Sequence, residues 1–155
     1  MSLQVKDKAP NFKLLNQNDE VIELKSLKSK VVLFFYPKDN TPGCTKEAIS
    51  FSKALSKLNN LGCLVFGISK DSTEKHKSFI KKNILLVDLL SDHENNTCEK
   101  YGVWVEKNMY GRKYFGIERT TFLIDERKKI IKVWNKVKVK NHVEDVLAYI
   151  KEIST

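Results

Sequence analysis

The stretch FFYPKDNTPGCTKEAISF, residues 34–51, joins an apolar run to a helical pattern through a loop that contains two prolines. The apolar run ends at Tyr36, and from Ala48 onwards apolar residues recur at helical spacing. Cys44 lies at this junction, directly after a turn-forming Pro-Gly pair. Helix N-termini carry unpaired N–H groups and a partial positive charge, and both favour a thiolate over a thiol. The position therefore predicts a cysteine that is kept for its reactivity.

The sequence on either side of this loop alternates between strand and helix patterns. Short runs rich in Val, Leu, Ile and Phe are typical of strands buried on both faces. These runs are VVLFFY (31–36), CLVFGIS (63–69) and ILLVDLL (84–90). We expect amphipathic helices between them, over residues 45–60 and in the segment DSTEKHKSFIKKN (71–83). The alternation predicts parallel β-α-β units.

The C-terminal part predicts a hairpin and a final helix. TTFLID (120–125) and IIKVW (130–134) read as two strands that turn at Asp125–Lys128. The helix of residues 71–83 and the final helix each begin with the spacing of a capping box, Asp71 with Glu74 and Asn141 with Glu144. Residues 1–155 are therefore expected to form a single α/β domain, a sandwich with a mixed central sheet and helices on both faces.

This topology predicts which residues surround Cys44. Ligands of open α/β sheets gather at the carboxyl ends of parallel strands, and Cys44 directly follows one such end. An antiparallel strand starts at the same edge, and Arg119 directly precedes TTFLID. We therefore expect Arg119 near Cys44, where its guanidinium would stabilise a thiolate. Thr41 can offer a hydroxyl to whatever the sulfur attacks, and Pro37 can stiffen the loop and shield the sulfur.

The composition narrows the class of protein. The formal net charge of +9 comes almost entirely from lysines that are spread along the chain and not interleaved with exposed aromatic residues, so we expect no nucleic-acid partner. No apolar run approaches the length of a membrane span, and the N-terminal residues lack a secretory signal pattern. Three cysteines suit a reducing cytoplasm better than a disulfide framework. A cytoplasmic protein without a membrane partner is expected.

The loop also carries a family pattern. Pro37, Thr41 and Cys44 form P-x-x-x-T-x-x-C, which resembles the active-site pattern of the peroxiredoxins, thiol peroxidases of the thioredoxin fold. KDKAPNFKL, VFGIS, LLSD, YGVW and ERTTFLID are similar to other segments of that family and occur in its order over nearly the whole chain. The wording YPKDNTPGCT most resembles the bacterioferritin comigratory protein branch, also called peroxiredoxin Q.

The resemblance implies a thioredoxin-like fold and a role for each residue of the motif. Cys44 corresponds to the peroxidatic cysteine, Thr41 and Arg119 to residues that bind and polarise peroxide, and Pro37 to the shielding proline. The Cys44 thiolate would attack a peroxide oxygen and become a sulfenic acid. The family implies hydrogen peroxide and organic hydroperoxides as substrates, thioredoxin or another thiol as reductant, no metal or organic cofactor, and a monomer.

The chain departs from this branch where the sulfenic acid would be resolved. Ile49 and the stretch SFIKKN (78–83) occupy the two positions at which members of the branch carry a resolving cysteine. Cys63 follows the helix that begins at Cys44, so roughly 20 Å separates the two, too far for a disulfide. Cys98 follows LLVDLL at the same carboxyl edge as Cys44 and is the better internal candidate. We expect one-cysteine behaviour with an external thiol in preference to a Cys44–Cys98 bond.

Other classes explain less of the pattern. A thiol-disulfide oxidoreductase would need C-x-x-C, but Glu47 stands at the second cysteine position. A cysteine hydrolase would need a partnered histidine, which the sequence does not signal. The alternative that stays open is a non-catalytic thioredoxin-fold binding module or a redox sensor, although a binding module would not need Thr41, Cys44 and Arg119 together.

Several polar residues are expected to have no role in chemistry. Glu47, in the first helical turn, is interpreted as structural. His76, His93 and His142 are expected to be solvated or to cap helices. His93 and Cys98 are too few ligands for a zinc site. Trp104 is expected to pack locally.

Overall fold

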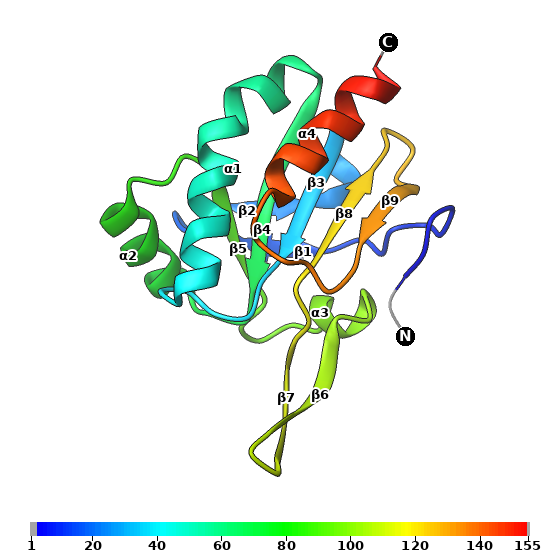
Figure 1. Ribbon diagram of the computed structural model, residues 1–155. Coiled ribbons are helices and arrows are strands. Elements are labelled where there is room, and N and C mark those ends of the chain that lie inside the picture. Colours follow the sequence, from blue (N-terminus) through cyan, green and yellow to red (C-terminus); the bar gives the residue numbers. More distant parts are fainter. Residues whose placement is uncertain (1–2, 155) are drawn as a thin grey trace.

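Seven strands form one mixed sheet in the computed structural model, which describes residues 3–154 (Figure 1). The strand order is β2-β1-β5-β4-β3-β8-β9. The strands are β1 (Lys13–Leu15), β2 (Val21–Glu23), β3 (Lys30–Phe35), β4 (Cys63–Ser69), β5 (Asp88–Ser91), β8 (Thr120–Ile124) and β9 (Ile130–Trp134). The helices are α1 (Pro42–Asn60), α2 (Thr73–Asn83), the four-residue α3 (Thr97–Lys100), α4 (His142–Ile153) and the 3-10 helix η1 (Leu24–Ser26).

The central strands have the predicted directions. β3, β4 and β5 run parallel, while β8 pairs antiparallel with both β3 and β9. The β8–β9 turn lies where it was expected, and the Lys128 N–H donates to the Asp125 carbonyl at 3.0 Å. The predicted strand 84–90 is wrong over its first four residues. Ile84 instead ends α2 in a left-handed conformation and is 83% exposed, so the strand starts only at Asp88.

Alternation along β3 divides the core into two layers. Val32, Phe34 and Tyr36 face the layer that contains α1, α2 and α4. Val31 and the other alternate residues face a second layer that is covered by α3, η1 and the N-terminal segment. Figure 1 shows α1 and α4 side by side on the first face. The predicted α/β sandwich is therefore confirmed, but its two faces are covered unequally.

The two predicted capping boxes are wrong. The N-cap of α2 is Ser72, whose hydroxyl accepts from the Lys75 N–H at 3.2 Å. Asp71 instead turns its carboxylate towards Ser69, whose hydroxyl donates to it at 2.7 Å. Asn141 precedes α4 in a left-handed conformation and makes no side-chain cap. None of the helices within residues 3–154 combines the length and the apolarity that crossing a bilayer requires.

A two-stranded hairpin that sequence reasoning did not predict extends from the sheet (Figure 1). It consists of β6 (Trp104–Met109) and β7 (Arg112–Ile117), joined by Tyr110 and Gly111, both with positive φ. Such a turn matches the twist of two antiparallel strands. Tyr110 and Phe115 are exposed beside Arg112 and Lys113. The expectation that basic residues are not interleaved with exposed aromatic residues is therefore wrong for this hairpin.

Candidate active site

Cys44 lies in the first turn of α1, where the chain leaves the carboxyl end of β3. Thr41 is the N-cap in extended conformation, and Pro42 at the first helical position has no N–H that would need a partner. The Thr41 carbonyl accepts from the N–H of Thr45 at 2.9 Å and from its hydroxyl at 2.7 Å, which fixes the first turn. Cys44 is 1% exposed. The sequence thus builds a rigid helix start around a buried sulfur.

Arg119 reaches this sulfur from the neighbouring strand. The antiparallel register pairs Phe35, the last residue of β3, with Thr120, the first residue of β8, so Arg119 lies at the edge where α1 begins. Arg119 Nη2 donates to Cys44 Sγ at 3.3 Å. The expected proximity of these two residues is therefore observed. A guanidinium at this distance favours negative charge on the sulfur.

Gly43 gives the guanidinium its room. A Cβ built at residue 43 would lie 3.2 Å from Arg119 Nη2 and 4.0 Å from a methyl group of Val139. The first contact is tighter than nine in ten real Cβ contacts, so with a larger residue the guanidinium would have to move by a few tenths of an ångström. The glycine before the cysteine therefore serves the approach of Arg119 as well as the turn.

Glu47 is a site residue that sequence reasoning interpreted only as structural. Its side chain is fully buried, and Oε1 accepts from Arg119 Nη1 at 2.6 Å. Within the described part of the chain, Oε2 has no hydrogen-bond partner. Burial raises the pKa of Glu47 to about 7, although Arg119 opposes the shift. The signal was present in the sequence, because residues three apart on a helix share a face, and Glu47 stands three after Cys44.

Thr41 and Pro37 belong to the loop that leads from β3 to Cys44. The Thr41 hydroxyl donates to the Lys38 carbonyl at 2.9 Å, so it rests against its own loop. Pro37 borders a surface pocket of about 340 Å³ whose opposite wall includes Trp104 and Lys107 of the β6–β7 hairpin. Trp104, expected to pack locally, stacks on Phe115 in that hairpin with ring centroids 6.5 Å apart.

Lys107 lies in the wall of this pocket, which Lys38, Lys70 and Asp71 also line. Its Nζ donates to the Ile117 carbonyl at 2.6 Å, and no carboxylate within residues 3–154 forms an ion pair with it. Burial and the charge of Arg119 lower the pKa of Lys107, while Glu118 and Cys44 oppose the shift. Lys107 is therefore near enough to Cys44 and Arg119 for their charges to act on it.

The other two cysteines lie elsewhere. Cys98 packs in the core layer on the opposite face of the sheet from Cys44. Burial raises the pKa of the Cys98 thiol, and the nearby Asp92 carboxylate raises it further. Cys63 pairs with Lys30 at the start of β3, so the length of the strand separates it from the loop at the other end. All three cysteines are free thiols.

The expectation that all three histidines are solvated or act as caps is wrong for two of them. His76 is completely buried, with Asp39 and the Leu90 carbonyl on its two ring nitrogens. His142 is 4% exposed, its Nε2 lies 2.8 Å from the Thr121 hydroxyl, and burial lowers its pKa to about 4. His93 is exposed, as expected. Tertiary packing, which local sequence does not encode, buries the other two.

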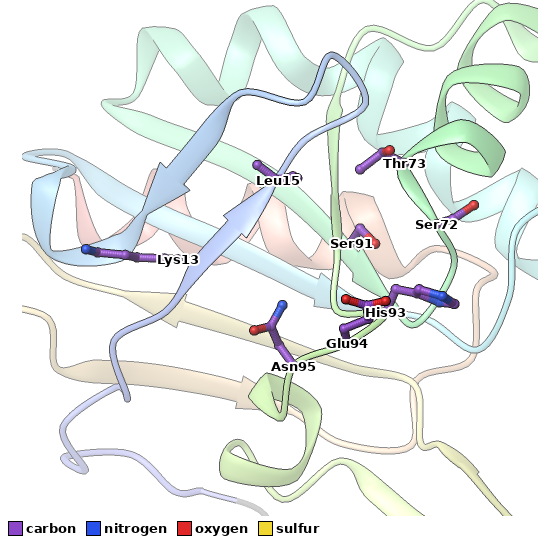
Figure 2. A pocket seen from close by; sticks show the side chains of 8 residues that line it. All are labelled: Lys13, Leu15, Ser72, Thr73, Ser91, His93, Glu94 and Asn95. Atoms are coloured by element: carbon purple, nitrogen blue, oxygen red, sulfur yellow. The ribbon is translucent and has the colours of Figure 1, made fainter.

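A further pocket, of about 230 Å³, shares no residue with this site (Figure 2). Residues from β1, from the start of α2 and from the end of β5 line it, among them Leu15, Thr73 and Ser91. The pocket has neither a cysteine nor Arg119 in its wall. At the start of α1, by contrast, a guanidinium donates a hydrogen bond to a sulfur.

Comparisons with known proteins show what this chain is similar to. Residues 5–133 match the profile of the AhpC/TSA family. A "putative peroxiredoxin bcp" of Coxiella burnetii is 55% identical over 148 residues, which are 95% of this chain and 98% of that relative. "Peroxiredoxin Bcp" of Bacillus subtilis is 43% identical over 155 residues, which are 99% of each chain.

Solved structures show the same similarity. A PrxQ mutant from Xylella fastidiosa superposes with a TM-score of 0.94 at 34% identity, over 100% of this chain and 99% of that one. The bacterioferritin comigratory protein of Xanthomonas campestris, studied for its alkyl peroxide reduction activity, superposes with a TM-score of 0.88 at 35% identity. That match covers 93% of this chain and 92% of the other.

Proposed function

This chain belongs to the AhpC/TSA family and is a thiol peroxidase of the peroxiredoxin kind, and we propose that Cys44 is its peroxidatic nucleophile. One observation carries the proposal: Arg119 Nη2 donates to Cys44 Sγ at 3.3 Å in the first turn of α1. The cation and the helix N-terminus both stabilise the thiolate that the reaction needs. The substrates proposed are hydrogen peroxide and organic hydroperoxides.

The proposed first step is a two-electron transfer from sulfur to peroxide. The Cys44 thiolate attacks one oxygen, the S–O bond forms as the O–O bond breaks, and sulfenic acid results. The leaving oxygen takes a proton and departs as water or as an alcohol. Arg119 stabilises the charge that develops on the two oxygens, as preorganised donors do in an oxyanion site. The Thr41 hydroxyl, next to the helix start, is proposed to turn from the Lys38 carbonyl to the bound peroxide.

Glu47 is proposed to divide the charge of Arg119 between two partners. When Glu47 is ionised, its carboxylate and the Cys44 sulfur both contact the guanidinium, through Nη1 and Nη2 respectively. Because burial raises the pKa of Glu47 to about 7, the carboxyl carries a proton in part of the molecules near neutral pH. In those molecules Arg119 faces the sulfur as its sole anionic partner at the site.

An external thiol is proposed to reduce the sulfenic acid. Cys44 and Cys98 pack in core layers on opposite faces of the sheet, which argues against a bond between them without large rearrangement. An incoming thiol would attack the sulfenic sulfur, release water and leave a mixed disulfide, and a second thiol would then free Cys44. Thioredoxin is the reductant proposed, with a low-molecular-weight thiol as the other source. The enzyme is further proposed to be a cytoplasmic monomer without nucleic-acid or membrane partners.

The test is stoichiometric oxidation of the reduced protein. One equivalent of hydrogen peroxide should be consumed with the loss of one fast-reacting thiol, and peptide mass spectrometry should place the sulfenic acid, trapped with a dimedone reagent, on Cys44. Thioredoxin with its reductase should then support repeated turnover. Oxidation of Cys44 without turnover on any thiol would favour a redox sensor. An abundant Cys44–Cys98 disulfide would overturn the one-cysteine mechanism.

A further inference from the structure

A buried polar network lies directly behind the loop that leads to Cys44. Asp39, 4% exposed, accepts at Oδ1 from the Tyr36 hydroxyl at 2.6 Å. Its Oδ2 lies 2.7 Å from His76 Nδ1, and His76 is completely buried in α2. His76 Nε2 lies 3.0 Å from the Leu90 carbonyl at the end of β5. The network therefore joins the loop to a helix and to a strand.

The acceptors around His76 determine where its protons are. A carbonyl oxygen can only accept, so Nε2 must carry the hydrogen that points to Leu90. The contact between Nδ1 and Asp39 then needs a hydrogen of its own, which belongs either to the imidazolium or to the carboxylic acid. In both forms the pair is neutral overall and all its hydrogen bonds are made. Such a satisfied buried pair is rigid, because losing either partner leaves a polar group without a partner.

The main chain of the same residue is held as well. The Asp39 N–H donates to Asp71 Oδ2 at 2.8 Å, and the Ser69 hydroxyl donates to the same oxygen at 2.7 Å. Asp39 stands midway between Pro37 and Thr41, two residues from each. The network thus fixes the loop at its centre by both side chain and backbone.

From this arrangement we propose that Asp39 and His76 are positioning residues for the peroxide reaction. By holding the loop from behind, they set where the Thr41 hydroxyl and the ring of Pro37 stand relative to Cys44. The inference rests on the proposed role of Cys44 and adds to it two residues that, within residues 3–154, form no hydrogen bond with the sulfur or with Arg119. A displacement of about 1 Å in a reacting geometry can lower the rate on the order of a hundredfold. The reaction rate should therefore be sensitive to the position of a loop that is held at one point from behind.

The same three side chains could be read as metal ligands. One ligand atom each from Asp39, Asp71 and His76 lie within 4.8 Å of one another. Those atoms are already used, since Nδ1 contacts Asp39 and Asp71 Oδ2 accepts two hydrogen bonds. An ion would have to replace bonds that are complete, so hydrogen bonding is the interpretation that the contacts support.

Two variants of His76 separate positioning from general packing. In His76→Asn, the amide nitrogen can occupy the place of Nδ1 and keep the donor to Asp39, whereas His76→Gln places its amide near Nε2 and keeps the donor to Leu90. We expect Cys44 in His76→Asn to react with peroxide at least about fivefold faster than in His76→Gln, because only the first variant still holds the loop. His93→Gln, an exposed histidine, is the matched control and should leave the rate unchanged.

The measurement is the second-order rate of Cys44 oxidation, followed together with the melting temperature of each variant. Tyr36→Phe removes only the hydroxyl that donates to Asp39, and like His76→Gln it should slow oxidation. Equal rates in the two His76 variants, or rates that follow melting temperature alone, would overturn the proposal. A chelator that lowers the wild-type rate would assign the cluster to a metal ion and would also overturn it. An unreactive Cys44 in wild-type protein would instead contradict the proposed function.

Discussion

Two cysteines of this protein lie in the first turns of helices, and the charged groups beside them differ in sign. Cys44 lies in the first turn of α1 and Cys98 in the first turn of α3, and both are buried. Arg119 donates to the sulfur of Cys44, whereas Asp92 lies beside Cys98 and accepts from its N–H at 2.8 Å. The proposed nucleophile Cys44 thus differs from Cys98 in the charged group beside it, although both cysteines are buried in the first turn of a helix.

Both helix starts also hold a cation and carboxylates, but the partners of the cation differ. At α3, Lys70 lies 3.1 Å from Asp92 and 2.8 Å from Glu99, so carboxylates take up its charge. At α1, Arg119 has two N–H groups directed at two partners, and the sulfur is one of them. The planar fork of arginine makes this sharing possible.

The largest expected effect tests the comparison itself. Cys44→Ser should slow peroxide consumption by on the order of 1,000-fold or more, because the serine hydroxyl stays protonated beside Arg119. Cys98→Ser should leave the initial oxidation rate unchanged, since burial and the nearby Asp92 raise the pKa of the Cys98 thiol. Stopped-flow consumption of hydrogen peroxide measures both. Comparable rates in Cys44→Ser and wild type would break the comparison.

The next effect tests the role of the Arg119 guanidinium. Arg119→Lys keeps a positive charge but has no planar fork, so it cannot contact Cys44 and Glu47 with two fixed N–H groups. The second-order rate should fall by about tenfold or more, about 1.4 kcal/mol or greater in the barrier. Arg112→Lys at the exposed hairpin tip is the matched control. An unchanged rate in Arg119→Lys would show that charge alone suffices.

Thr41→Val examines the hydroxyl at the helix start. Valine keeps the shape and removes the group proposed to hold peroxide, so the rate should fall by about tenfold, near 1.4 kcal/mol. Thr45→Val is the comparison variant, because it removes a hydroxyl that bonds to the Thr41 carbonyl and leaves the Thr41 hydroxyl in place. Equal losses in the two variants would assign the effect to the helix start as a whole.

The smallest effect concerns stability and pH. The native pKa of Glu47 is raised to about 7 from 4.5, so the folded state binds more protons than the unfolded state between these values. The contribution of Glu47 to the free energy of unfolding of the wild type should therefore decline as pH rises from 4.5 to 7. Glu47→Gln should lack that decline. Urea unfolding should show the variant gaining on the order of 1 kcal/mol relative to wild type across this range. A constant difference between the two proteins would contradict the buried-acid interpretation.

The sequence predicted the parts of the fold that local pattern encodes. The parallel strands, the β8–β9 hairpin and the proximity of Cys44 to Arg119 follow from apolar runs and from the edge at which parallel strands end. The β6–β7 hairpin was missed because its alternation is weak, although the Tyr110–Gly111 pair was a turn signal. The strand start at Asp88 was missed because an apolar run does not show where the preceding helix and loop end and the strand begins.

The motif residues of the candidate site were predictable from the sequence, whereas the residues that contact and position them were less so. Thr41, Cys44 and Arg119 could be named because few residue types can provide a nucleophilic sulfur, a hydroxyl for peroxide and a cation beside the thiolate. His76 could not be named, because its role depends on burial and on partners far away in the chain, and the signal for Glu47 was only its helical spacing from Cys44. Long-range contacts of this kind leave little trace in a single sequence.

The hydrogen bonds between Asp39 and His76 have a consequence for evolutionary change. Replacing one partner alone leaves a buried polar group unsatisfied, whereas replacing both with apolar residues of fitting volume can be nearly neutral. The fitness of a substitution at residue 76 is thus conditional on the residue at 39, and the two positions should be exchanged together across lineages. Intermediate sequences that carry only one of the pair should be rare.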